Sequence, residues 1–302
     1  MSRWRLVADI GGTNLRLARA GPSALLSDIV SKPLKDGTEL LDELRSFVCR
    51  FDADAIDGLV IAAAGPVDGQ RIVLTNRPLV VDADVIGSAF GDIPVILMND
   101  LQAVALSLPW LERNQVSPLI EVEASLAGPQ LVVNIGTGFG AAILVPTKRK
   151  NEWEAVACEP GHMTFPLGFS PGDANLQEVR TIEDYLSGRT LCSVTASERV
   201  WHRTPQMPRG QMFGPRENPE FVRAFTELVG HVCGNLVLAC GAWGGVFLTG
   251  SVVSRWRRRA DIDLFAKAFR QKGPMSQRMS RVPVNEICVD NPALIGLAHL
   301  RN

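Results

Sequence analysis

The feature of this chain that most constrains its fold is a strand–turn–strand motif that occurs twice. The two segments are LVADIGGTNLRLARA, residues 6–20, and LVVNIGTGFGAAILV, residues 131–145. In each, an apolar run ends in Asp or Asn and Ile-Gly, a turn of small residues follows, and a second apolar or alternating run leaves the turn. Two such hairpins, one in each half of the chain, predict two related domains.

Strands and helices are expected to mix in both halves, which favours an α/β protein. Apolar periodicity predicts helices near 38–51, 103–108, 181–186, 221–238, 262–272 and 292–300. Short buried apolar runs predict strands at 5–10, 15–20, 58–64, 95–98, 246–249 and 285–289, besides the second hairpin.

Composition narrows the class of protein. A chain of 302 residues with 46% hydrophobic residues is long enough for roughly two domains. The net charge of −1 gives no general field toward nucleic acid or an anionic membrane. Six scattered cysteines without a C-x-x-C pair favour a reducing compartment, and the opening MSRWR lacks a signal-peptide pattern. We therefore expect a cytoplasmic protein that binds neither nucleic acid nor membrane.

Three segments need a separate interpretation. Residues 236–253 are apolar for about the length of a membrane span, but glycines divide them, which favours a buried helix ending near Gly244 and then a buried strand. The basic run 255–259 is interpreted as the solvated start of a helix rather than a phosphate or nucleic-acid patch. Residues 201–220, rich in Pro, Gly and Arg, predict an exposed loop.

The repeated turns have the composition of phosphate-binding loops. Glycine backbone can present converging N–H groups to an anion, and Thr13 and Thr137 each add a hydroxyl donor. Asp9 can hold Mg²⁺ directly or through water, whereas Asn134 stands in the matching place, where a second carboxylate would repel ATP. An ordinary glycine hairpin is the alternative for either motif alone. Their occurrence in both halves favours a nucleotide clamp.

These motifs resemble those of a known superfamily. DIGGT at 9–13 and GTGFG at 136–140 resemble the two phosphate motifs of the actin-like sugar-kinase ATPases, and 246–251 resembles their adenosine motif. Over nearly the whole chain, the closer resemblance is to bacterial ATP-dependent glucokinases. It implies two actin-like (ribonuclease H-like) domains with an interdomain cleft, the cofactors ATP and Mg²⁺, and a homodimer. The ATP-binding residues implied are Asp9, Gly11, Gly12, Thr13, Asn14, Gly136, Thr137, Gly138, Gly250 and Ser251.

The resemblance also suggests the domain boundaries. The C-terminal NPALIGLAHL resembles a helix that returns to the first domain of the family. We therefore expect a small domain of residues 1–108 plus 290–302 and a large domain of residues 109–289.

The pair Asn99-Asp100 permits two interpretations. Asp and Asn before a helical run are favoured as N-caps. A cap at the end of a buried strand also lies where α/β sheets bind their ligands, so both roles are compatible. The segment resembles the glucokinase stretch in which Asn binds a sugar hydroxyl and Asp is the catalytic base. Asp100 would then accept the proton of the sugar 6-hydroxyl.

The remaining candidates would bind the sugar. By themselves, Glu159 and His162 suggest a surface turn, and Glu183 suggests a carboxylate favoured by a helix dipole. Glu159 and His162 alone are two ligands, and two ligands do not make a zinc site. The E-x-G-H and E-x-x-L-S-G patterns resemble the sugar-reading motifs of the family, and Gly65 and Asn76 match its substrate-side loops.

Four positions depart from the family pattern, and they leave the sugar open. They are Leu79 for a usual Trp, Pro160 for a Gly, Thr164 for a common Asp and Ser251 for a Gly. The resemblance implies an ATP:D-glucose 6-phosphotransferase. The alternatives are a kinase for another hexose (fructose, mannose or an N-acetyl amino sugar) and a non-catalytic nucleotide or sugar sensor. Retention of Asn99-Asp100, Glu159 and His162 together argues against the sensor.

Overall fold

The computed structural model divides the chain into two compact units. It describes residues 3–12, 14–34, 39–52, 55–75, 77–149, 151–164, 181–192, 212–214 and 217–300. The first unit holds Met1–Glu112, Lys150–Ala157 and Val289–Asn302, and the second holds Arg113–Arg149 and Cys158–Cys288. The division after the first segment thus lies a few residues beyond the expected 108/109, and residues 150–157 group with the first unit.

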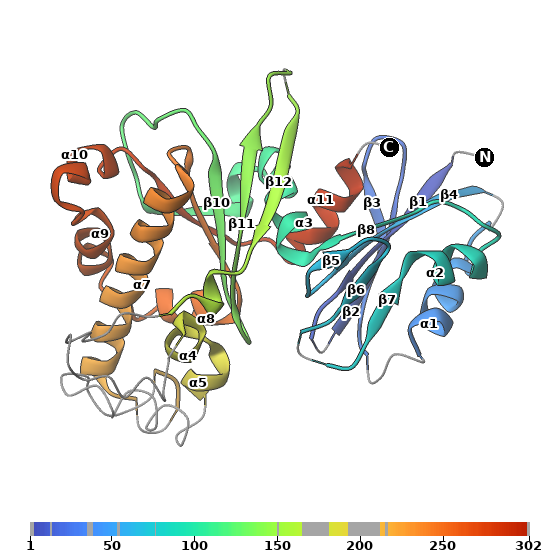
Figure 1. The fold of residues 1–302 in the computed structure, drawn as a ribbon, viewed down its shortest axis with the longest axis horizontal. Coiled ribbons are helices and arrows are strands. Elements are labelled where there is room, and N and C mark those ends of the chain that lie inside the picture. Colours follow the sequence, from blue (N-terminus) through green and yellow to red (C-terminus); the bar gives the residue numbers. More distant parts are fainter. Residues whose placement is uncertain are drawn as a thin grey trace. The chain divides into compact units, whose positions relative to one another are not determined.

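The first unit is built on a five-stranded sheet with the order β3-β2-β1-β4-β8 (Figure 1). Its strands are β1 (Trp4–Ile10), β2 (Asn14–Ala20), β3 (Leu26–Pro33), β4 (Ile56–Ala63) and β8 (Val95–Asn99). The first hairpin is β1–β2, which pairs antiparallel, whereas β1, β4 and β8 run parallel. Strands β1 and β4 read as continuous apolar runs because they are buried, as in parallel sheets covered on both faces.

Helices and a small sheet complete the first unit. The helices are α1 (Glu39–Val48), α2 (Ala83–Ala89), α3 (Asp100–Ser107) and α11 (Pro292–His299), and the small sheet is β5 (Val67–Asp68), β6 (Arg71–Val73) and β7 (Val80–Asp82). The last helix packs closely on α3, because a Cβ added at Gly296 would lie 1.9 Å from the carbonyl oxygen of Ala103. This glycine allows the C-terminal helix to return to the first unit.

The second unit repeats the same sheet pattern. The sheet order is β12-β11-β10-β13-β14-β9, and β12 falls almost wholly within residues 150–157, which group with the first unit. The strands are β9 (Val116–Ile120), β10 (Gln130–Ile135), β11 (Phe139–Pro146), β12 (Trp153–Cys158), β13 (Gly245–Thr249) and β14 (Val284–Ile287). The second hairpin is β10–β11, and β10, β13 and β14 run parallel, as β1, β4 and β8 do. The expected α/β fold with two related domains is confirmed.

The helices of the second unit are α4 (Ile182–Leu186), α5 (Gly188–Cys192), α7 (Pro219–Cys240), α8 (Ser251–Arg257), α9 (Ile262–Arg270) and α10 (Ser276–Met279). Among the described residues, α7 is the one helix long and apolar enough to cross a membrane, but 67% of its apolar window is buried in the unit's own core. It ends at Cys240, between the two expected ends at 238 and near Gly244, because Gly241 adopts the left-handed conformation with φ +63°. The apolar stretch is therefore a core helix followed by β13.

The basic run 255–259 corrects a prediction. It lies at the end of α8 and not at the start of a helix. Trp256 within it is fully buried and donates from Nε1 to Thr226 Oγ1 at 2.9 Å. Arg255, Arg258 and Arg259 are exposed, so the expectation of a solvated segment holds for these arginines, and Arg259 pairs with Glu217 at 2.9 Å. Of the expected loop 201–220, residues 201–211 and 215–216 lie outside the described residues, and Pro219 already begins α7.

Candidate active site

The candidate residues of the first unit gather where three parallel strands end. Asp9 is the penultimate residue of β1, Asn99 is the last residue of β8, and Gly65 follows β4, which lies between those two strands. The register pairs Ile10 with Ala63 and Ala63 with Asn99, so these ends are level. The carboxyl ends of parallel strands are where open α/β sheets bind ligands.

Asn99 is a buried N-cap whose position is fixed on both sides. Its Oδ1 accepts from the backbone N–H groups of Leu101 and Gln102 at 2.9 and 3.2 Å, and its Nδ2 donates to the Gly65 carbonyl oxygen at 3.1 Å. Gly65 has no room for a side chain, because a Cβ would lie 2.4 Å from the Val73 carbonyl oxygen. The capping interpretation therefore holds, and it places the amide at the sheet edge. An amide nitrogen has two hydrogens, and Gly65 takes one of them.

Asp100 is the first residue of α3 and is half-buried. Its Oδ1 accepts from the Leu101 backbone N–H at 2.9 Å. The N-terminal end of a helix favours a negative charge, so the fold holds this carboxylate in a defined place beside Asn99. The loop residue Asn76 lies outside the described residues. Its neighbour Thr75 donates from Oγ1 to the Ala64 carbonyl oxygen at 3.4 Å.

The first hairpin carries a buried ion pair. The backbone N–H of Gly11 donates to the Asn14 carbonyl oxygen at 2.9 Å, which closes the turn. Asp9 is 6% exposed, and its Oδ2 lies 2.7 Å from Arg16 Nη1. Burial raises the pKa of Asp9 above its usual 3.8, and the neighbouring Arg16 works in the opposite direction. Thr13 lies outside the described residues.

The carboxylate of Asp9, the candidate magnesium ligand, is already paired with Arg16. No group of three or more His, Cys, Asp or Glu side chains is placed to hold a metal within the described part of the chain. Arg16 already engages one carboxylate oxygen of Asp9, so a cation in direct contact would lie beside a guanidinium. Mg²⁺ readily keeps several waters and takes other ligands from substrate phosphates. The pairing with Arg16 therefore favours contact through water over direct coordination.

The second hairpin is fastened to the segment that follows α4. Within the turn, the backbone N–H of Gly136 donates to the Gly138 carbonyl oxygen at 3.0 Å. From outside it, Gly188 donates its N–H to the Gly136 carbonyl oxygen at 2.7 Å, and Arg189 donates its N–H to the Thr137 carbonyl oxygen at 3.4 Å. The first residues of α5 therefore pair directly with the turn.

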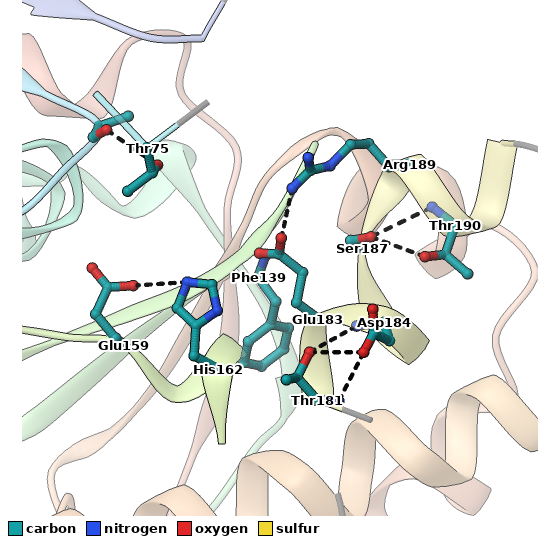
Figure 2. A network of polar contacts seen from close by, with 11 residues as sticks. Thr75, Phe139, Glu159, His162, Thr181, Glu183, Asp184, Ser187, Arg189 and Thr190 are labelled. Atoms are coloured by element: carbon teal, nitrogen blue, oxygen red, sulfur yellow. Dashed lines mark hydrogen bonds and ion pairs between the residues drawn. The ribbon is translucent and has the colours of Figure 1, made fainter. Parts of the chain in front are cut away.

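Glu183 contacts the same hairpin through its side chain (Figure 2). Its Oε2 accepts from the Phe139 backbone N–H at 2.9 Å, and its Oε1 pairs with Arg189 Nη2 at 2.6 Å. A capping box between Thr181 and Asp184 fixes the start of α4, which positions Glu183 at the second residue of the helix. This carboxylate, singled out from the sequence for a sugar, is thus also bound to the hairpin.

The loop that carries Glu159 and His162 lies against Phe139, the first residue of β11. Glu159 Oε2 lies 4.0 Å from His162 Nε2, and both side chains are more than half exposed. Between them, a Cβ on Gly161 would lie 2.2 Å from the Phe139 carbonyl oxygen, so only glycine permits this approach. Pro160 is buried at the start of the one-turn helix Pro160–His162, and Thr164 forms an isolated bridge with Thr181. Figure 2 shows Glu159 and His162 on the same side of the hairpin as Glu183.

Gly250 joins the adenosine-like motif to the second hairpin. It has φ +106° and a Cβ there would lie 2.4 Å from the Ile135 carbonyl oxygen and 2.5 Å from Asn134 Oδ1. Ser251 follows as the first residue of α8 and is exposed. The structure therefore brings together, in the second unit, the turn Gly136–Gly138, Gly250, Glu159, His162 and Glu183.

The sequence analysis did not single out two arginines of these sites. Arg16 is the cross-strand partner of Asp9, and the expected register of the first hairpin would have revealed it. Arg189 pairs with a carboxylate on the preceding helix, and its backbone N–H pairs with a turn some fifty positions earlier in the chain. No local sequence pattern predicts that contact.

Comparison with solved structures identifies the class of protein. A glucokinase from an Antarctic psychrotroph superposes with a TM-score of 0.75 at 25% identity and covers 99% of this chain and 98% of its own. A glucokinase from Balamuthia mandrillaris, solved in complex with glucose, has the same TM-score at 16% identity. At this identity, the similarity shows a shared fold only. The fold is that of the sugar kinases with an actin-like ATPase architecture.

Sequence comparison narrows the class to a family. The sequence profile of the glucokinase family matches residues 6–202 and 214–302. The glucokinase of Chromobacterium violaceum is 29% identical over 314 residues, which cover 97% of this chain and 88% of that protein. The glucokinase of Nitrobacter hamburgensis is 28% identical, with 99% and 98% covered. The chain belongs to the glucokinase family of sugar kinases, and its resemblance to bacterial glucokinases is confirmed.

Proposed function

We propose that this sugar kinase transfers the γ-phosphate of ATP to the 6-hydroxyl of D-glucose, giving glucose 6-phosphate and ADP. One observation carries the proposal: Asn99 ends β8 beside Gly65 and Asp100 begins α3 directly after it, at the level strand ends where a ligand of an α/β sheet binds. Membership of a family whose relatives are named glucokinases supplies the reaction class.

Asp100 is the proposed catalytic base. Phosphoryl transfer requires alignment, charge neutralisation and a group that orients the attacking hydroxyl. The carboxylate of Asp100 would accept the 6-hydroxyl proton as the oxygen–phosphorus bond forms, and the second hydrogen of Asn99 Nδ2 would position the sugar. A base of this kind contributes about 10²–10⁴ in rate.

Sugar recognition is proposed for Glu159, His162 and Glu183, with Gly65 and Asn76 on the substrate side. Charged hydrogen-bond partners contribute about 1.5–3 kcal/mol each, enough to distinguish epimers. The proposal requires these residues and Asp100 to act on the same sugar molecule.

Nucleotide binding is proposed for the two turns and the adenosine-like motif. Backbone N–H groups of Gly11, Gly12 and Gly136–Gly138 would bind phosphate oxygens, and Gly250 and Ser251 would lie at the adenosine. Thr13, Asn14 and Thr137 would add polar contacts. Mg²⁺, with Asp9 in its outer shell, would neutralise phosphate charge. A homodimer in the cytoplasm remains part of the proposal, supported by the family resemblance alone.

The proposed base is tested by Asp100→Asn. We expect turnover to fall by about 10² or more, because the amide cannot accept the proton. ADP release would be followed with ATP, Mg²⁺ and glucose, and the thermal unfolding midpoint would report the fold. Asp84→Asn is the matched control, because Asp84 is also an acidic residue in the first turn of a helix of the same unit. Turnover of Asp100→Asn near that of the wild type would exclude Asp100 as the base.

The sugar is tested with glucose, mannose, fructose, galactose and N-acetylglucosamine in turn. Preference for glucose supports the full proposal. Preference for another sugar keeps the kinase and corrects the substrate, with Pro160 and Thr164 as the first residues to revert, because they flank His162 in the sugar-reading segment. Leu79 is buried in the core of the first unit. ATP binding without turnover on any sugar would favour the non-catalytic sensor.

A further inference from the structure

A carboxylate lies where a phosphate-binding turn should not tolerate one. Glu183 Oε2 is 2.9 Å from the Phe139 N–H, at the first residue after the second turn. The same oxygen would be 2.6 Å from a Cβ built on Gly138, so it lies against the turn itself. A full negative charge at this distance opposes the binding of nucleotide phosphates, because like charges a few ångströms apart repel by more than 1 kcal/mol even near the surface.

Arg189 supplies the opposite charge. Its Nη2 lies 2.6 Å from Glu183 Oε1, the oxygen that Phe139 does not use. The Glu183 side chain is 21% exposed and that of Arg189 is 55% exposed, so solvent screens the pair only in part. Figure 2 shows the guanidinium reaching across to the carboxylate from the helix that follows Glu183.

The backbone around Arg189 holds it in this place. Its own N–H donates to the Thr137 carbonyl oxygen, and the preceding Gly188 donates to Gly136 and has no room for a Cβ, which would lie 2.5 Å from the Gly136 carbonyl oxygen. Arg189 therefore moves with the turn.

We propose that Arg189 is a positioning residue that neutralises Glu183 and thereby lets one carboxylate bind the sugar while it lies against the turn that binds ATP. This inference rests on the proposed function, because it assigns Glu183 to the sugar and the second turn to the nucleotide. It predicts that the charge of Arg189 controls nucleotide affinity through Glu183 and that its hydrogen bond controls the orientation of Glu183 toward the sugar.

Charge and shape are separated by two substitutions. Arg189→Gln keeps a long polar side chain without the charge, and we expect it to raise the KM for ATP about fivefold to tenfold. Arg189→Lys keeps the charge, and its KM for ATP should stay within about twofold of the wild type. The kcat should change less than the KM in both. The increase in Arg189→Gln should shrink at high salt, because the pair is partly exposed.

The decisive variant is Glu183→Gln combined with Arg189→Gln. If Arg189 acts by neutralising Glu183, removal of both charges should return the KM for ATP to within about twofold of the wild type. The KM for the sugar should be above that of the wild type, because the Glu183 carboxylate is lost. Arg259→Gln is the matched control, because Arg259 forms an exposed ion pair with Glu217 in the same unit. An Arg189→Gln variant with an unchanged KM for ATP would overturn the proposal, as would a double variant as weak for ATP as Arg189→Gln.

Direct titration with a non-hydrolysable ATP analogue, without sugar, separates this proposal from the proposed function. If no sugar is phosphorylated by the wild type, the function fails, but the analogue still reports whether Arg189→Gln weakens nucleotide binding and whether the double variant restores it. If sugar turnover is normal and Arg189→Gln binds the analogue as tightly as the wild type, only the role of Arg189 fails.

Discussion

The two hairpins have similar backbones but carry their charges differently. In the first, the carboxylate of Asp9 is part of β1, and Arg16 faces it directly from β2. In the second, Asn134 stands at the matching position, and the carboxylate comes instead from Glu183 on α4, with Arg189 beside it. Each phosphate-type turn therefore has one acidic group and one arginine, but only the first pair is local in sequence.

The difference in burial gives the pairs different properties. The side chains of Asp9 and Arg16 are 9% and 31% exposed, whereas those of Glu183 and Arg189 are 21% and 55% exposed. A buried pair is weakly screened by salt and costly to break, whereas an exposed pair is screened and easily rearranged. The pair at the second hairpin is therefore the more strongly screened by solvent and salt.

Asn134→Asp would make the second hairpin resemble the first in sequence but not in charge balance. Arg189 is already paired with Glu183, so the new carboxylate would add an uncompensated charge beside the turn. We expect the KM for ATP to rise about a hundredfold, with the KM for the sugar little changed. Steady-state kinetics with each substrate varied in turn would measure both.

Asn134→Ser is the control, because it removes the amide without adding a charge. A large rise in the KM for ATP in both variants would mean that the amide itself, and not the absence of a carboxylate, matters at this position. The contrast between the hairpins would then be one of hydrogen bonding.

Matched glycines distinguish the turns sterically. A Cβ at Gly138 would meet Glu183 Oε2 at 2.6 Å, whereas a Cβ at Gly12 meets no described heavy atom within 4 Å. Gly138→Ala should therefore displace the carboxylate from the Phe139 N–H and lower the free energy of unfolding by about 1–2 kcal/mol, while Gly12→Ala should leave it nearly unchanged. Denaturant unfolding without ligands measures both, and equal losses would contradict the difference.

Local patterns in the sequence predict much of this arrangement. Both hairpins, the N-cap at Asn99 and the end of β8 follow from apolar runs and capping residues. Strand β3 was missed because none of its residues is buried and they include Asp28 and Lys32, so no apolar run marks it. The strand is defined by its pairing with β2.

Long-range packing determines the parts that were missed or wrong. The basic run around Trp256 predicted a solvated helix start, but it lies at the end of α8, and the indole is buried and hydrogen-bonded to Thr226 on α7. Arg189 is likewise defined by backbone contacts with Gly136–Gly138. The surface that a charged segment packs against depends on the folded chain, so it cannot be predicted from the residues of that segment alone.

The smallest expected effect concerns the pH dependence of the first hairpin. Burial raises the pKa of Asp9 above 3.8, with Arg16 opposing, so the folded state binds this proton more tightly than the unfolded state. The resulting stability is fully present below pH 3.8 and is lost as pH rises through the raised pKa. Asp9→Asn has no such titration. Relative to that of the wild type, its free energy of unfolding should therefore increase as pH rises through this window.

Asp82→Asn provides the opposite sign in the same unit. Hydrogen bonds from the Val85 N–H and from Arg71 lower the pKa of Asp82 below 3.8, so its contribution is present above pH 3.8 and is lost as pH falls through the lowered pKa. Denaturant unfolding at a series of pH values, followed by tryptophan fluorescence, would compare the three proteins. Parallel profiles for Asp9→Asn and the wild type would mean that Arg16 fully compensates the burial of Asp9. The first pair would then be as balanced as the second, and burial would no longer distinguish the two hairpins.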